Sequence, residues 1–177
     1  MTRVFSAADD AVVLELEDLE RAILDDLAQQ VIGLLEQDDA PPSDPLAAMV
    51  GIGTETEPPD DPALARLLPD GFTDDPAASA EFRRFTEVGL RQRKVADARE
   101  VRRGLEGASP LRLDAEQARQ WLGFLNDVRL VLGTRLGVTE EPVELAEDDP
   151  QLPLFGLYGW LGVLQETLVE SLMPRHP

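Results

Sequence analysis

The sequence predicts a mainly α-helical fold, a compact bundle of about four main helices to which a short N-terminal β-hairpin could be added. Apolar residues recur every three or four positions in four long segments. Stretches rich in proline, glycine and acidic residues separate these segments. With 43% hydrophobic and 29% charged residues, the 177 residues suffice for a core, so we expect one helical domain over residues 1–177.

The N-terminal part predicts the hairpin and the first helix. Residues 2–6 and 11–16 are rich in residues that favour strands, and the four residues between them could close a turn. Asp18 then follows as a helix cap. We expect a first helix over about residues 19–37, with an apolar stripe formed by Leu19, Ile23, Leu27, Val31 and Leu34.

Proline and acidic residues dominate the segment of about residues 38–62, which we interpret as a linker, because proline fixes φ and donates no amide hydrogen bond. Residues 46–50 and 63–68 could each form a short helical turn. Asp70, Asp74 and Asp75 lie around Gly71, and their spacing is typical of a turn, not of a calcium loop.

Three longer helices follow. The first is expected over residues 76–105, beginning at Pro76, with the apolar positions Phe82, Phe85, Val88, Val95, Ala98, Val101 and Leu105. Asp114 and Gln117 predict a capping box for the next helix, which ends at Gly137 and carries the stripe Ala118, Trp121, Leu122, Leu125, Val128, Leu132 and Leu136. An acidic loop at about 139–153 precedes a last helix that ends before Pro174 and is marked by Leu154, Leu157, Leu161, Leu164, Leu168 and Leu172.

Composition excludes several classes of function. The chain has no cysteine, so thiol catalysis, cysteine metal sites and disulfide switches are excluded. Its one histidine, His176, lies next to the C-terminal residue, so we predict no histidine triad or histidine metal site, no cofactor and no enzyme. An enzyme that uses carboxylates alone is a remaining rival. The N-terminus has no apolar signal segment, and the apolar run at 152–164 is shorter than the roughly 20 residues that cross a bilayer, so we expect a cytoplasmic protein that does not enter the membrane.

Basic charge is concentrated in the middle of an acidic chain. Residues 81–106 hold 8 of the 16 Lys and Arg residues, whereas the net charge of the whole chain is −19. On a helix, Arg84, Arg91 and Arg102 align with Lys94 nearby. These four could bind a partner, and acidic protein partners are favoured over nucleic acid because the net charge repels phosphate. The alternative is a solvated helix whose basic side chains pair with acidic segments of the same chain.

The last helix contains Gly156, Gly159 and Gly162 at intervals of three. Their lack of side chains would allow close approach of another helix, within the subunit or across a dimer. Because the helix is apolar on more than one face, a homodimer that packs through Gly156, Gly159, Trp160 and Val163 is expected.

Several motifs in order along the chain resemble the AosR-like family of actinobacteria, long catalogued as a domain of unknown function. They are Leu-Glu-Asp-Leu-Glu at 16–20, Asp-Pro-Leu at 44–46, Leu-Leu-Pro-Asp at 67–70, Glu-Phe-Arg-Arg-Phe-Thr at 81–86, Trp-Leu-Gly-Phe-Leu-Asn-Asp-Val-Arg-Leu at 121–130, Arg-Leu-Gly at 135–137 and Leu-Tyr-Gly-Trp-Leu at 157–161. The family carries no catalytic signature.

The resemblance implies a cytoplasmic regulator of the oxidative-stress response and of cysteine biosynthesis, linked to a sulfur-carrier protein. It implies action through protein partners in transcription, such as a sigma factor or RNA polymerase. This chain departs from redox sensing by a disulfide, because it has no cysteine. We therefore predict a regulatory interaction protein. The alternative is direct DNA binding through the basic helix 76–105 and the N-terminal hairpin, which requires an exposed basic stripe.

Overall fold

The computed structural model describes residues 5–8, 11–37, 53, 57–139, 146 and 148–173. The mainly α-helical prediction is confirmed. The helices are α1 (Asp18–Glu36), α3 (Pro62–Leu67), α4 (Pro76–Leu105), α5 (Ala115–Leu136) and α6 (Leu152–Leu172), and the strands are β1 (Phe5–Ala8), β2 (Ala11–Leu14) and β3 (Leu111–Leu113). The helical turn expected at 46–50 lies outside the described residues, as do most of the linker and much of the acidic loop.

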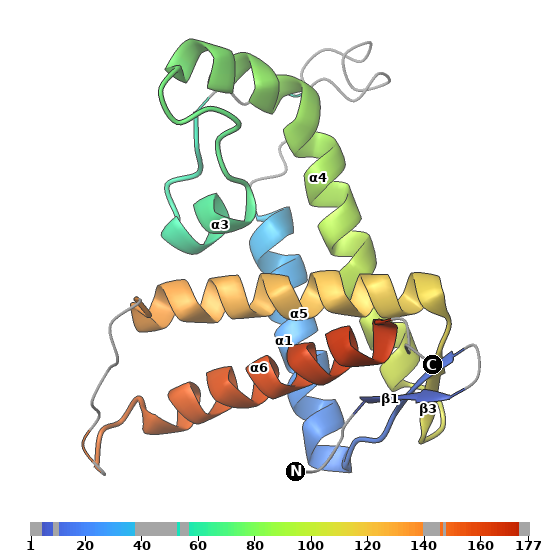
Figure 1. The fold of residues 1–177 in the computed structure, drawn as a ribbon. Helices are drawn as coiled ribbons and strands as arrows, with labels where there is room; N and C mark the ends of the chain where they lie inside the picture. Colours follow the sequence, from blue (N-terminus) through green and yellow to red (C-terminus); the bar gives the residue numbers. More distant parts are fainter. Residues whose placement is uncertain are drawn as a thin grey trace.

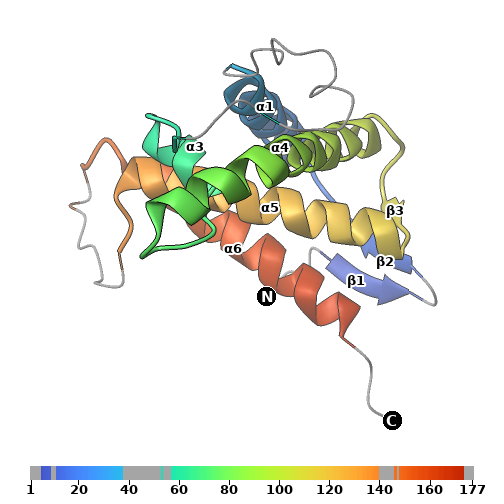
Figure 2. The ribbon, with the colours of Figure 1, turned by 90° about the horizontal axis from the view of Figure 1, so that it is seen from above.

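Of the four long helices, α5 is central, and the other three pack around it in layers. Figure 2 shows α5 in the middle, with α1 and α4 on one side and α6 on the other. In Figure 1, α5 and α6 run side by side in opposite directions, and α4 crosses them so that its N-terminal half extends beyond the pair. The short α3 packs against α5. This arrangement encloses α5 and leaves the outer face of α6 with no helix on it in the described part of the chain.

The small sheet lies at one end of this stack, where β1 packs against α6. Its order is β1-β2-β3 and both pairs are antiparallel, with Phe5 opposite Leu14 and Val12 opposite Leu113. The predicted hairpin is therefore confirmed, although Ala7 and Ala8, which were expected in its turn, belong to β1. The third strand was missed, because three residues are too few to show an alternating pattern. Phe5 meets Trp121 of α5 edge to face at 6.1 Å, which joins the sheet to the helical core.

Helix ends follow the sequence signals with one correction. The cap of α1 is Glu17, not Asp18, and Glu17 and Glu20 form a capping box. The box at Asp114 and Gln117 is confirmed, and Gly137 ends α5 in the left-handed region at φ 65°. The expected ends of α4 are also confirmed.

Two predicted apolar stripes are rotated relative to the real core. In α1, Leu19 is 70% exposed, whereas Val31 is buried as predicted and Leu27 and Leu34 are partly buried. The other fully buried positions of this helix are Leu24, Ala28 and Leu35. In the N-terminal half of α4, Phe82 and Phe85 are exposed, whereas the C-terminal positions expected to be apolar are buried as predicted. The side chains buried beside these phenylalanines are charged, and they occupy positions that apolar periodicity cannot detect.

Candidate interaction surface

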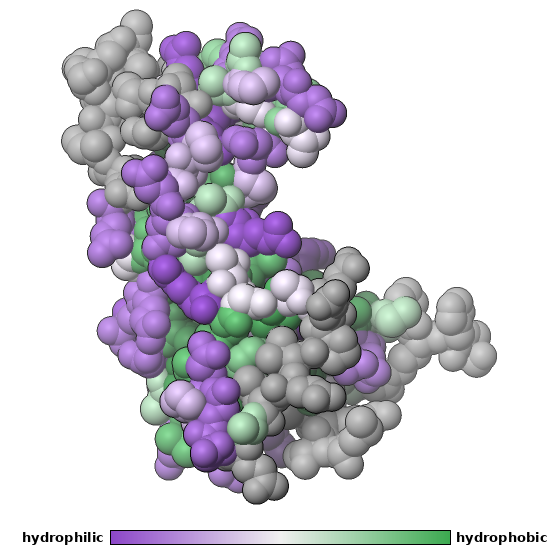
Figure 3. All heavy atoms as spheres, turned by 90° about the vertical axis from the view of Figure 1, so that its left-hand side faces the viewer, coloured by the Kyte–Doolittle hydropathy of each residue, from purple (hydrophilic) through white to green (hydrophobic). Residues whose placement is uncertain are grey.

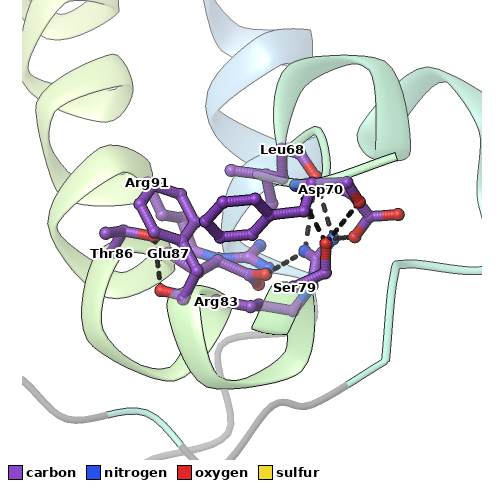
Figure 4. Close-up of polar contacts among 9 residues, drawn as sticks. Leu68, Asp70, Ser79, Arg83, Thr86, Glu87 and Arg91 are labelled. Atoms are coloured by element: carbon purple, nitrogen blue, oxygen red, sulfur yellow. Dashed lines mark hydrogen bonds and ion pairs between the residues drawn. The ribbon is translucent and has the colours of Figure 1, made fainter. Parts of the chain in front are cut away.

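The basic residues of α4 were the most conspicuous feature of the sequence, and two of them are buried. Figure 4 shows Arg83 and Arg91 on either side of Glu87. The side chain of Arg83 is 3% exposed, and Arg83 pairs with Glu87 and, at 2.7 Å, with Asp70; Arg91 binds the other oxygen of Glu87 at 2.8 Å. Arg83 also donates to the carbonyl of Leu68 at 3.3 Å, at the end of α3. Glu87 thus bridges two buried guanidinium groups, and Asp70 supplies the second carboxylate.

Arginines also close the ends of two antiparallel helices. Arg91 of α4 donates to the carbonyl of Leu35 in the last turn of α1. In the opposite direction, Arg21 of α1 donates to the carbonyl of Leu105 in the last turn of α4 and, at 2.6 Å, to that of Gly107. The last four carbonyls of a helix have no partner within the helix and carry partial negative charge. Each helix therefore supplies the positive cap that the other needs.

Two further basic residues of α4 are held by acidic residues of other helices. Lys94 binds Asp127 of α5 at 2.6 Å, and Arg102 binds Asp25 of α1 at 2.7 Å. The hydrogen bond from Arg102 lowers the pKa of Asp25. Asp97 lies beside the Lys94–Asp127 pair, and burial, followed by the charge of Asp127, raises the pKa of Asp97 to about 6. α4 therefore carries an internal network of charges.

Of the four residues predicted to bind a partner, only Arg84 takes part in no ion pair between described residues. Arg91, Lys94 and Arg102 are engaged with other elements of the chain, as the alternative interpretation of the basic segment required. They do not form an exposed stripe. A partner-binding role for these four residues stays a prediction.

A small apolar cluster lies at the free end of α4, near Arg84. Phe72 meets Phe82 edge to face at 6.0 Å, and both rings are exposed, as is Phe85. Figure 3 shows many hydrophilic residues at this end of the molecule, at the top of the view. The exposed residues Glu81 and Arg84 lie beside the phenylalanines in the sequence. The cluster is an exposed surface with charges of both signs around it.

The outer face of α6 is apolar and uncovered in the described structure. Leu152, Gly156, Gly159 and Val163 follow one another at helical spacing along it, and Val163 is 46% exposed. A Cβ atom added at Gly156 or Gly159 would meet no atom within 4 Å. No helix of the described chain therefore packs on these two glycines, whereas Gly162 does lie close to the side chain of Arg129. Packing of these residues across a dimer stays a prediction.

An open groove of about 730 Å³ adjoins this face. Trp160 and Val163 of α6 line one side, and Ser109 and Pro110 lie in the loop before β3. The remaining lining comes from the start of α1 and the segment before it, and consists of Glu15, Leu16, Glu17 and Glu20. All the ionisable side chains that line the groove are therefore carboxylates. We call this the acidic groove.

The acidic groove differs from the other hollows of the described structure in the side chains that line it. A groove of about 400 Å³ between α1 and α5 is lined mostly by apolar side chains. Another, of about 390 Å³, contains Arg129, which lies over the Tyr158 ring at 5.0 Å. Within the described ranges, no group of three or more acidic or histidine side chains could hold a metal ion. Nor does any described helix combine the length and hydrophobicity needed to cross a bilayer.

Comparison with known proteins identifies the family. A family described as a domain of unknown function, DUF2017, matches residues 1–172. The chain belongs to this family. Relatives named oxidative stress regulator AosR, from Mycobacterium tuberculosis and Mycobacterium bovis, are 36% identical over 87% of this chain and 78% of their own length. A putative regulator of the same name from Mycobacterium leprae is 34% identical over 87% of this chain and 79% of its own length. No solved structure matches.

The suspected family membership is thus confirmed, although the acidic groove was not foreseen. Its residues come from three segments that are far apart in the sequence, so no local motif joins them. The one available signal was the density of carboxylates at Glu15, Glu17 and Glu20 before and within the first helical turn. Because the chain has 35 Asp and Glu residues, the sequence alone does not distinguish these three carboxylates from the others.

Proposed function

We propose that this chain is a cytoplasmic regulator of the oxidative-stress response that acts by binding protein partners, among them transcription machinery such as a sigma factor or RNA polymerase. The observation that carries the proposal is the similarity to relatives named oxidative stress regulator, which extends over 87% of the chain. Binding in place of catalysis is supported by the arrangement of charge. The perturbed carboxylate Asp97 packs between two helices beside Asp127 and lines none of the grooves described above.

Protein partners are favoured over DNA by the state of the basic helix. A DNA-reading helix needs unpaired basic side chains on one exposed face. In α4, Arg83 and Arg91 are buried in ion pairs, and Lys94 and Arg102 bind carboxylates of other helices. The net charge of −19 adds long-range repulsion from phosphate. Direct DNA binding is therefore the weaker of the two candidates.

The absence of cysteine from the sequence bears on how such a regulator receives its signal. Thiol oxidation is the usual reversible chemistry by which a protein responds to peroxide. This chain has no thiol, so a thiol signal has to arise in a partner and reach this chain through binding. The proposal thus assigns the chain the role of a regulatory subunit that transmits the signal.

The test is made in the host. A deletion strain should lose viability in peroxide, and the tagged chain expressed at its native level should restore it. Pull-down of the tagged chain, with and without nuclease and at two salt concentrations, should retain a sigma factor or polymerase after nuclease treatment. Retention of promoter DNA that nuclease and salt abolish would support direct DNA binding instead. Normal peroxide resistance of the deletion strain would refute the stress role.

A further inference from the structure

We infer that the acidic groove is the docking site for a basic segment of a partner protein, with an apolar side chain of that segment on Trp160 and Val163 and its Lys or Arg side chains against Glu15, Glu17 and Glu20. The inference rests on the proposed function and deepens it, because it names the surface that binds and the chemistry of what is bound.

The first step is the shape and polarity of the groove. Its volume of about 730 Å³ can hold several side chains. Trp160 is partly buried against the core, so its ring is fixed, and Val163 is exposed beside it. The uncovered face of α6 continues the apolar floor from Val163 back to Leu152, a length of about 16 Å at the rise of an α-helix. A rigid apolar floor with a charged rim is the usual anatomy of a peptide-binding groove.

The second step is the charge of the rim. Glu15, Glu17 and Glu20 form no ion pair with any described residue. Glu20 accepts one hydrogen bond from the backbone of Glu17 at 2.8 Å, which leaves acceptor capacity on both of its oxygens. The nearby base Arg21 is occupied with the carbonyls at the end of α4. These carboxylates repel one another, and a cationic ligand would relieve that repulsion.

A second copy of this chain is the competing occupant of the acidic groove. A two-fold symmetric contact places a patch against the same patch of the other copy. A dimer built on the acidic groove and the adjoining face of α6 would bring two sets of three carboxylates together, in a chain of net charge −19. Like charges at an interface oppose its formation. Charge complementarity therefore selects a basic occupant.

The exposed phenylalanine cluster at the free end of α4 is a weaker candidate for a docking site. The exposed side chains around Phe82 include Glu81 and Arg84, which have opposite signs, so this cluster does not specify the charge of an occupant. The acidic groove does specify it, because its lining contains carboxylates and no base.

The experiment uses the full chain and a synthetic amphipathic peptide of leucine and lysine, about 18 residues long so that it can form a helix, without Trp or Tyr. A twin peptide with glutamate in place of lysine serves as the control for charge. Trp160 lies in the groove, whereas Trp121 is 1% exposed. Binding of the lysine peptide should therefore change the fluorescence emission of Trp160. A Trp160→Phe variant should not show this change, and its binding is measured instead by the fluorescence anisotropy of a labelled peptide. The glutamate peptide should not bind.

Matched variants locate the binding. Val163→Lys and the double variant Glu15→Gln/Glu20→Gln should each weaken the lysine peptide about tenfold or more. Leu154→Lys is the control for Val163→Lys, since Leu154 is on the opposite side of α6 and is equally exposed, at 45%. Asp74→Asn/Glu81→Gln removes the same charge far from the groove and is the control for the glutamate pair. Both controls should bind within about twofold of the wild type.

Equal losses in the variants and their controls, or no binding of the lysine peptide, would overturn the inference. So would a wild-type dimer in light scattering that Val163→Lys alone dissociates, because a second copy would then occupy the face. The peptide titration does not depend on the host. If the deletion strain resists peroxide normally, the stress role fails while the groove is still tested; if the titration fails and the strain is sensitive, only the groove is wrong.

Discussion

The helices α4 and α6 differ in composition, since α4 is rich in charged residues and α6 is apolar. In both helices, the exposure of the side chains to solvent is the reverse of what composition suggests. α4 carries a dense set of charges, yet many of them face other elements of the chain and hold α1, α3 and α5 in place. α6 is the most apolar of the four long helices, yet it leaves Leu152, Gly156, Gly159 and Val163 uncovered in the described structure. Conspicuous charge is thus structural here, and the uncovered apolar face is the better candidate for binding.

The largest expected effect tests the structural half of this comparison. Glu87→Ala removes the one carboxylate between Arg83 and Arg91 and leaves two buried guanidinium groups without it. Breaking a buried ion pair from one side costs about 3–5 kcal/mol. Urea unfolding followed by circular dichroism should show this loss. Glu81→Ala, on the exposed side of the same helix, should change the free energy of unfolding by less than about 0.5 kcal/mol. Equal losses in the two variants would mean that the buried charges are not structural.

The second largest expected effect tests the structural role of the arginines at the ends of α1 and α4. Arg21→Met keeps much of the apolar stem of the side chain but removes the donor to the carbonyls of Leu105 and Gly107. We expect a loss of about 1–3 kcal/mol, because carbonyls at the end of a helix lose a charged partner. The control is Arg99→Met, which breaks an exposed pair with Glu36 and should cost about 0–1 kcal/mol. Amide hydrogen exchange should show the loss of protection first in the last turn of α4.

A third effect is a gain of stability that depends on pH. Burial and Asp127 raise the pKa of Asp97 to about 6, from 3.8 in the unfolded chain. A raised carboxyl pKa means that the folded state binds the proton more tightly, so the cost of the charge is absent below pH 3.8 and fully present above pH 6. Asp97→Asn should therefore stabilise the protein at pH 7.5 by on the order of 1 kcal/mol, and the gain should disappear near pH 4. A gain of the same size at both pH values would contradict this cause.

Most of the fold could be predicted because local signals are strong where helices begin and end. The proline at the start of α4, the capping box at Asp114 and the left-handed Gly137 each specify a boundary through backbone chemistry alone. The phase of the apolar stripes was harder to predict. In α4 the core positions are filled by Arg83, Glu87 and Arg91, and paired charges can be buried only where distant elements supply their partners.

The α6 side of the candidate surface could be predicted from the sequence, whereas the acidic groove could not. The sequence predicts packing through Gly156, Gly159, Trp160 and Val163, and in the described structure both glycines are uncovered. What covers them depends on a second molecule, which one sequence does not contain. The acidic groove required the fold itself, since its rim and floor come from the two ends of the chain.

The smallest expected effect on stability concerns the exposed residues of α6, and it tests whether a second copy of the chain covers this face. Val163→Lys and Leu154→Lys replace side chains of equal exposure, 46% and 45%, so each should change the free energy of unfolding by less than about 0.5 kcal/mol. Thermal unfolding of the wild type and both variants at two protein concentrations measures this. A second copy on the face would raise the wild-type melting temperature with concentration, because association stabilises the folded state by mass action, and Val163→Lys would remove that dependence. Melting temperatures that do not change with concentration leave the face uncovered in the free protein, so that its apolar surface remains available to a partner.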